Sequence, residues 1–167
     1  MVIVLHVHSV AELWFVNKMK QLIFETNAKQ CIINELKKYQ NVETGGVLLG
    51  VFENNNIYIV EAVGGGDKAI RDQGMFQYDA EYVELQSNIL ARKCSKQLVL
   101  VGLWHKHNHT LEPAFSDADI RMHQLLLEQC EYGVSCLFQR KTNTEYQIQY
   151  MDCEGLIHRS TSVWKCE

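Results

Sequence analysis

Short apolar runs and helically spaced apolar residues alternate along this chain, which predicts a fold with both strands and helices. The run Leu98–Trp104 is apolar throughout, as is typical of a strand buried on both faces. The cluster Asn54–Asn56 lies between two apolar runs and predicts the turn of a β-hairpin. The expected strands are Val2–Val7, Gln21–Glu25, Val47–Gly50, Ile57–Val60, Leu98–Trp104 and the alternating segments from Val134 onward.

Three segments have the apolar spacing of amphipathic helices. Thr26 or Asn27 is expected to cap a helix in which Ile32, Ile33, Leu36 and Tyr39 recur at helical spacing. Asp79 is expected to start a second helix that continues through Leu90, and the third is expected over Asp117–Glu131.

The domain organisation follows from what lies between these elements. Ala11–Lys20 fits a helix and a strand equally well, and Gly64–Gly66 opens a long polar loop. The chain has a single proline, Pro113, and no Ser-, Pro- or Gly-rich linker, so we expect one domain over residues 1–167. Residues 1–20 form an N-terminal extension to which the pattern assigns no role. Mixed strands and interspersed helices predict an α/β or α+β fold, with a mixed β-sheet flanked by helices.

The composition changes the picture mainly by exclusion. A hydrophobic share of 47% and a charged share of 22% are typical of a soluble globular domain. Sixteen basic residues are scattered among twenty acidic ones, so we expect no nucleic-acid partner. The sequence has no apolar stretch of about 20 residues and no signal-peptide pattern, so we expect no membrane partner and a cytoplasmic location. The six cysteines lack zinc-ribbon spacing and are expected to be reduced, mostly as core residues.

The segment richest in candidate chemistry is His105-Lys106-His107, at the end of a predicted strand. Alternate strand residues point to the same face, so the two imidazoles project side by side and Lys106 points away. The next predicted helix begins at Ser116–Asp119, where an aspartate can fold back as a third ligand. Three protein ligands and a free fourth position are the pattern of a catalytic zinc site.

Each of these features also has a purely structural explanation. A lone His-x-His pair is commonly a surface or hydrogen-bonded pair, and Ser116-x-x-Asp119 fits an ordinary capping box. Glu43, which precedes two glycines, can simply be the last polar residue before a turn and strand. His109 and His123 have no partner at ligand spacing and are interpreted as solvated or structural residues.

Three motifs, which occur in the family's order, resemble those of the JAMM zinc metallopeptidases. The domain of this family is called MPN. The motifs are most similar to those of its prokaryotic JAB branch. They are E-T-G-G-x-L-L-G from Glu43 to Gly50, G-x-W-H-x-H from Gly102 to His107 and S-x-x-D from Ser116 to Asp119. The match extends from about Ile23 to about Tyr132. This resemblance implies an MPN-like domain, in which helices flank a curved mixed β-sheet to form a sandwich similar to that of cytidine deaminases.

The resemblance also implies roles for individual residues. His105, His107 and Asp119 match the ligands of one catalytic Zn²⁺, Glu43 matches the general acid/base, and Ser116 matches the hydroxyl that hydrogen-bonds the developing oxyanion. The family usually has proline at position 108, where this chain has asparagine, and a shorter interval before the serine. The longer interval keeps Asp117 as a competitor for the third ligand position.

The function implied by this resemblance is zinc-dependent cleavage after the C-terminus of a ubiquitin-like protein. The enzyme is then an isopeptidase or precursor-processing peptidase of a bacterial conjugation system, such as an antiphage system, with E1-like and E2-like enzymes of the same operon as possible partners. Met75 and Phe76, in the loop after the glycines, are candidate substrate-binding residues, although both can equally pack into the core. Two alternatives remain: a peptidase for ubiquitin-fold sulfur-carrier proteins, and a non-catalytic MPN scaffold.

Overall fold

Nine strands and three helices form the part of the chain that the computed structural model describes, which is residues 19, 21–108 and 115–165. The strands are β1 (Gln21–Phe24), β2 (Thr44–Glu53), β3 (Asn56–Gly64), β4 (Ile70–Arg71), β5 (Phe76–Gln77), β6 (Val99–His107), β7 (Val134–Arg140), β8 (Glu145–Met151) and β9 (Ile157–Lys165). The helices are α1 (Thr26–Lys38), α2 (Ala80–Lys93) and α3 (Asp117–Leu127). The expected elements Val2–Val7 and Ala11–Lys20, and His109, lie outside the described residues.

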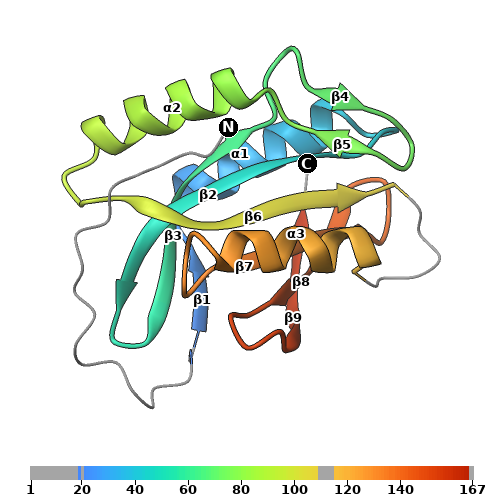
Figure 1. Cartoon of the computed structure of the whole chain (residues 1–167). Helices are drawn as coiled ribbons and strands as arrows, with labels where there is room; N and C mark the ends of the chain where they lie inside the picture. The colour runs from blue at the N-terminus through green and yellow to red at the C-terminus, as the bar shows by residue number, and fades with distance from the viewer. Residues whose placement is uncertain (1–18, 20, 109–114, 166–167) are drawn as a thin grey trace.

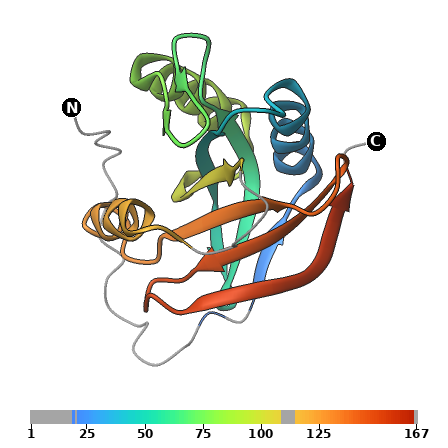
Figure 2. The same cartoon turned by 90° about the vertical axis from the view of Figure 1, so that its right-hand side faces the viewer.

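Seven of the strands form one mixed sheet in the order β1-β3-β2-β6-β7-β8-β9. The pairs β1–β3 and β6–β7 are parallel, and the other neighbours are antiparallel. The sheet curls strongly, so that its two edge strands come back toward each other (Figure 2). The expected mixed sheet flanked by helices is confirmed.

The helices cover the sheet from both sides, with α1 on one face and α2 and α3 on the other (Figures 1 and 2). The α1 face holds the larger core, in which three buried helix residues, Ala28, Ile32 and Leu36, pack against Trp104 and Phe138. The opposite face holds a second core of buried valines and leucines beneath α2. Adjacent β2 residues alternate between these cores, since Leu48 belongs to the first and Val47 and Leu49 to the second.

The structure corrects three details of the predicted elements. Helix α1 is capped by Glu25, not by Thr26 or Asn27, because the Glu25 amide still donates to Ile59 O and so belongs to the parallel β1–β3 pairing. Helix α3 ends at Leu127, four residues early, and the chain then turns through Cys130–Gly133. The expected polar loop after the glycines contains the short β4–β5 hairpin.

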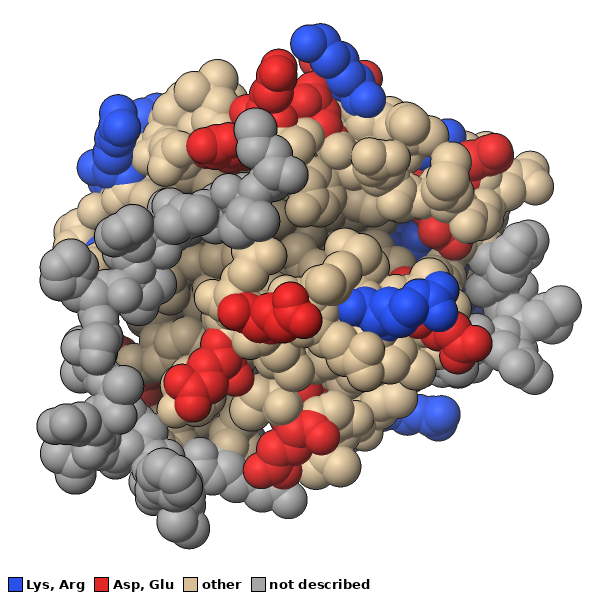
Figure 3. All heavy atoms as spheres, in the orientation of Figure 1, with Lys and Arg blue, Asp and Glu red and all other residues tan. Residues whose placement is uncertain are grey.

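Two local sequence expectations, a helix cap and a hairpin turn, are met. Asp79 caps α2 by accepting a hydrogen bond from the Tyr82 amide, and the Asn54–Asn55 turn joins β2 to β3 with both asparagines at positive φ. The five described cysteines are free thiols, but only Cys136 is fully buried, so the expectation that most of them are core residues is wrong for this part of the chain. Within the described ranges, no helix combines the length and apolarity needed to cross a membrane. Figure 3 shows acidic and basic side chains interspersed on the face that carries α3.

Candidate metal centre

The carboxyl end of β6 positions the two histidines. Strand β6 is central, paired with β2 on one side and β7 on the other, so its backbone is held by two ladders. His105 and His107 project on the same side of the strand, toward α3, and their Nε2 atoms lie 3.1 Å apart. The intervening Lys106 lies on the opposite face, as the alternation of a strand predicts.

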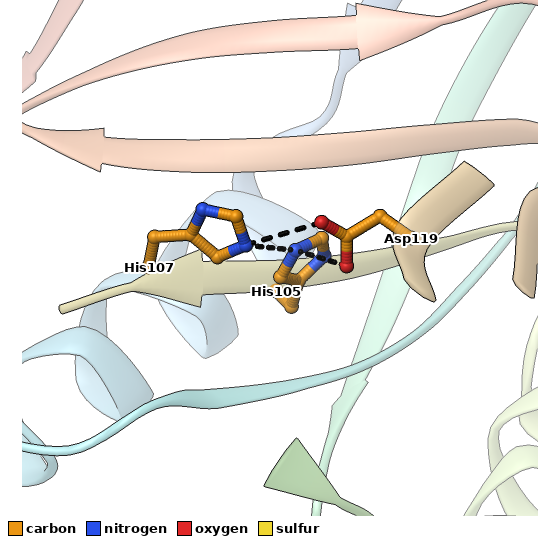
Figure 4. A group of neighbouring side chains, drawn as sticks. All are labelled: His105, His107 and Asp119. Atoms are coloured by element: carbon orange, nitrogen blue, oxygen red, sulfur yellow. Dashed lines mark hydrogen bonds and ion pairs between the residues drawn. The ribbon is translucent and has the colours of Figure 1, made fainter. Parts of the chain in front are cut away.

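Asp119, in the first turn of α3, reaches both imidazoles (Figure 4). Its Oδ1 lies 3.1 Å from His105 Nε2, and its Oδ2 lies 3.2 Å from His107 Nε2. All three side chains are largely buried, with 16–20% of their surface exposed. The end of β6 and the start of α3 thereby bring these three residues into one compact group.

The donor set of this group fits a divalent metal ion. One ligand atom from each of the three residues can be chosen so that all lie within 4.8 Å of one another. A tetrahedral zinc ion with ligand bonds of about 2.0–2.1 Å requires ligand atoms about 3.3 Å apart. The two imidazole Nε2 atoms, 3.1 Å apart, nearly match this separation, and Asp119 approaches each imidazole with a different oxygen. Two imidazoles and one carboxylate leave a fourth position without a protein ligand, as in catalytic zinc sites.

Asp119 also belongs to a capping box at the start of α3. Its Oδ2 accepts hydrogen bonds from Ser116 N and from Ser116 Oγ, both at 2.7 Å, while the Asp119 amide donates to Ser116 Oγ at 3.2 Å. The structural explanation of Ser116-x-x-Asp119 is therefore correct, and the same carboxylate also faces the histidines. The cap fixes the carboxylate where the imidazoles need it and holds the Ser116 hydroxyl beside the group.

The charges in this group shift the pKa values of its members. Burial raises the pKa of Asp119, but hydrogen bonds from His105, His107 and Ser116 outweigh burial and hold the pKa well below its usual range. Burial lowers the pKa of His107, yet the hydrogen bond and charge of Asp119, helped by the charge of Glu43, raise it overall. The carboxylate is thus ionised at neutral pH, the state in which it binds a metal.

Glu43 is placed next to this group by the pairing of β2 with β6. Thr44 is paired with Lys106 and Gly45 with His105, so Glu43, immediately before them, lies beside the end of the ligand strand. A Cβ at Gly45 would lie 2.3 Å from Trp104 O, so only glycine permits this approach. The Glu43 amide donates to Asp72 O at 2.8 Å.

Lys106 anchors the ligand strand from behind. Its side chain is fully buried, and Nζ donates to Tyr39 O at 2.6 Å and to Gln40 O at 3.0 Å, just after the end of α1. Burial and the nearby Arg140 guanidinium lower the pKa of Lys106 to about 8, against the opposing charge of Glu43. A cation at the carboxyl end of a helix is favourably placed, because the last carbonyls there lack partners.

The remaining candidate residues differ in their placement. Asp117 is exposed and does not belong to the His105–His107–Asp119 group. Asn108 donates to Asn41 O at 2.9 Å, which ties the chain leaving β6 to the turn before β2, and the loop 109–114 lies outside the described residues. Met75 is 51% exposed at the tip of the β4–β5 hairpin. Phe76 is half-buried and packs against Gly65.

One histidine expectation and one omission complete the comparison. His123 is structural, as interpreted, since it is buried and its ring nitrogens lie 2.9 Å from Ser135 Oγ and from Asp152 O. The pattern gave no sign of the buried pair Glu35 and Arg71 beside Glu43, because their sequence spacing matches no known motif. Only the folded chain brings them together.

A comparison of the sequence with models of known protein families, and with curated proteins, finds no match. Comparison of the structure with solved structures does find similar folds. One is the solution structure of protein DSY2949 from Desulfitobacterium hafniense, with a TM-score of 0.56 over 83% of this chain and 89% of that chain. The two sequences are 13% identical, so this similarity concerns the fold alone.

Proposed function

We propose that this protein is a zinc-dependent peptidase of the JAMM type, built on an MPN-like domain, that cleaves after the C-terminus of a ubiquitin-like protein. The observation that carries the proposal is the compact group of His105, His107 and Asp119, with Glu43 beside it, immediately before the neighbouring strand β2. The three motifs quoted above supply the family, and the arrangement of their residues supports it. E1-like and E2-like enzymes of the same operon are proposed partners.

In this mechanism His105, His107 and Asp119 would hold a zinc ion, which would supply Lewis acidity to lower the pKa of water to about 7 and to polarise a carbonyl group. The Glu43 carboxylate accepts the proton from the attacking water and returns it to the leaving amine. The Ser116 hydroxyl, whose single proton is donated to Asp119 Oδ2 in this structure, turns that hydrogen bond to the oxyanion that develops on the scissile carbonyl. Both residues therefore act on charge that appears only as the bond breaks.

The decisive experiment compares cleavage and metal content in matched variants. The probe is a ubiquitin-like protein from a neighbouring gene, extended beyond its C-terminal glycine by a short fluorescent peptide. Glu43→Gln removes the proton acceptor but no ligand, so we expect full zinc content and a loss of at least about 100-fold in kcat. His105→Ala is expected to lose both zinc and cleavage, because two remaining ligands bind the ion weakly.

The controls separate the proposed enzyme from its alternatives. Glu61→Gln changes a carboxylate that bonds Asn27, away from the metal group, and should leave cleavage unchanged. A chelator should abolish activity and added zinc should restore it. Purification without stoichiometric zinc would favour the scaffold alternative, and cleavage that survives in Glu43→Gln would refute the role given to that residue. Mass spectrometry of the products identifies the bond that is cut.

A further inference from the structure

A buried arginine lies beside the turn that carries Glu43, and the proposed mechanism does not use it. The side chain of Arg71 is 7% exposed and that of Glu35 is 17% exposed, with Arg71 Nη2 3.8 Å from Glu35 Oε2. Nη2 makes no hydrogen bond with any described residue. A buried ion pair with an unsatisfied donor adds little to the free energy of unfolding, because the desolvation of both charges offsets their attraction.

The remaining bonds of Arg71 join two separate segments of the chain. Its Nε donates to Thr44 Oγ1 at 3.2 Å, and its Nη1 donates to Gly66 O at 2.9 Å. The Thr44 hydroxyl in turn donates to Glu35 Oε2 at 3.2 Å. The guanidinium therefore links the start of β2, the loop after β3 and helix α1.

The surroundings of Arg71 hold its guanidinium in one place. The Tyr39 ring lies over it, with 3.8 Å between the ring centroid and Cζ, and the Phe76 ring lies 5.9 Å away. A Cβ at Gly64 would lie 2.1 Å from Glu35 Oε1, and a Cβ at Gly65 would lie 2.9 Å from Arg71 Nη2. Because Gly64 and Gly65 carry no side chains, they leave the space that this charged pair occupies.

Arg71 and the residue after it bond the two consecutive residues Thr44 and Glu43. Arg71 bonds the side chain of Thr44, and Asp72 O accepts a hydrogen bond from the Glu43 amide at 2.8 Å. Two consecutive residues of the hairpin segment therefore hold two consecutive residues at the start of β2. Thr44 is also paired with Lys106, between the two histidines, so this attachment sets where Glu43 lies relative to them.

We propose that Arg71 is a positioning residue for Glu43: its guanidinium, paired with Glu35, fastens the β4–β5 hairpin to Thr44, so that the Asp72 carbonyl of the same hairpin holds the Glu43 amide and keeps the Glu43 carboxylate at the metal group. This proposal rests on the proposed function for its effect on catalysis. A misplacement of about 1 Å at a reacting group can lower a rate about 100-fold. The fork of donors that arginine carries fills this role better than a single ammonium, which can make only part of these bonds.

The test uses the full-length, zinc-loaded protein and the fluorescent ubiquitin-like fusion described above. Arg71→Met is expected to lower kcat by about 10- to 100-fold, with KM and zinc content within about twofold of wild type. Arg71→Lys keeps the charge and should recover part of the lost kcat. Arg92→Met, which removes an exposed arginine from α2, is the matched control and should match wild type.

A second measurement does not depend on activity and keeps the two proposals apart. Hydrogen exchange of the Glu43 amide should be at least about 10-fold faster in Arg71→Met and Arg71→Lys, while the β6 amides stay protected. Unchanged exchange in a folded variant, or an unchanged kcat, would overturn the positioning role. A loss of kcat accompanied by a comparable rise in KM and by a loss of zinc would also overturn it, in favour of general disruption. If wild type cleaves no fusion but the exchange rises as expected, the proposed function fails and the attachment of Glu43 by Arg71 stands.

Discussion

Asp119 is bonded from two directions, by the start of its own helix and by the two histidines. The first set of bonds needs no metal, because a capping box stabilises the helix by itself. The second set brings the carboxylate within ligand distance of both imidazoles. Helix capping thus prepares the ligand before any ion arrives, which reduces the ordering required on binding.

These two roles predict different results for the two aspartates of the α3 start. Asp119→Ala should abolish stoichiometric zinc binding and lower the free energy of unfolding of the apoprotein by about 1 kcal/mol through loss of the cap. Asp117→Ala should retain zinc, because Asp117 lies outside the metal group. Metal analysis and denaturant unfolding of both variants measure these effects. Zinc retained in Asp119→Ala but lost in Asp117→Ala would reverse the assignment.

At the scale of elements, the metal group depends on how β6 is attached to its neighbours. Lys106 joins the ligand strand to the end of α1 through two carbonyls, and Gly45 lets β2 approach on the other side. Arg140 donates to the same Gln40 carbonyl at 3.4 Å. Three elements therefore converge behind the two imidazoles and hold that end of the strand in place.

Lys106→Met tests this attachment, because methionine retains most of the apolar stem and removes the ammonium. The variant leaves the carbonyls of Tyr39 and Gln40 without their principal donor, so we expect a loss of about 1–3 kcal/mol in the free energy of unfolding. Lys96→Met is the matched control, since Lys96 forms an exposed ion pair with Glu25. It should leave the free energy of unfolding nearly unchanged, because an exposed ion pair contributes little to stability. Equal losses in the two variants, measured by urea unfolding, would contradict the anchoring role of Lys106.

Local patterns predicted most of the elements because the information lies within each segment. The Asn54–Asn55 turn, the Asp79 cap and the alternation that turns Lys106 away from the histidines depend on neighbouring residues. The cap of α1 could not be predicted, since Glu25 is fixed by pairing with β3, a strand more than thirty residues away. Arg71 was missed for the same reason, because its role depends on contacts between distant segments.

At the scale of the whole molecule, the curl of the sheet brings its two edges together. Trp164 of β9 packs edge-on against Phe24 of β1, with ring centroids 5.0 Å apart, and against Phe138 at 5.2 Å. The two edge strands thus share one aromatic cluster beside α1. Between them lies an open groove of about 460 Å³, lined by β1, β8 and β9. Its residues are separate from the metal group.

Global stability should depend on pH through the buried His123, which joins α3 to β7 and to the turn after β8. Burial lowers the pKa of His123, against the opposing effect of Asp152. A pKa that is lower in the folded state means that the unfolded chain binds the proton more readily. The stability contributed by neutral His123 is therefore present above the unfolded pKa of about 6.5 and declines as the pH falls below it.

Urea unfolding of the apoprotein at pH 8 and at pH 5.5 tests this prediction, because it gives the free energy of unfolding at each pH. The free energy of unfolding should fall between the two pH values, and His123→Asn, although less stable, should show a smaller fall. His107, whose pKa is raised, works in the opposite sense, so the variant must be compared with wild type. An identical fall in both proteins would show that His123 is not the group responsible.

The alternation of β6 also limits where this sequence can change in length. Addition or removal of one residue between Gly102 and His105 would exchange the two faces of the strand from that point on. The imidazoles would then turn toward α1 and the lysine toward α3, and no side-chain adjustment would restore them. Insertions and deletions in homologues should therefore fall before Val99 or after His107, where both imidazoles keep their orientation.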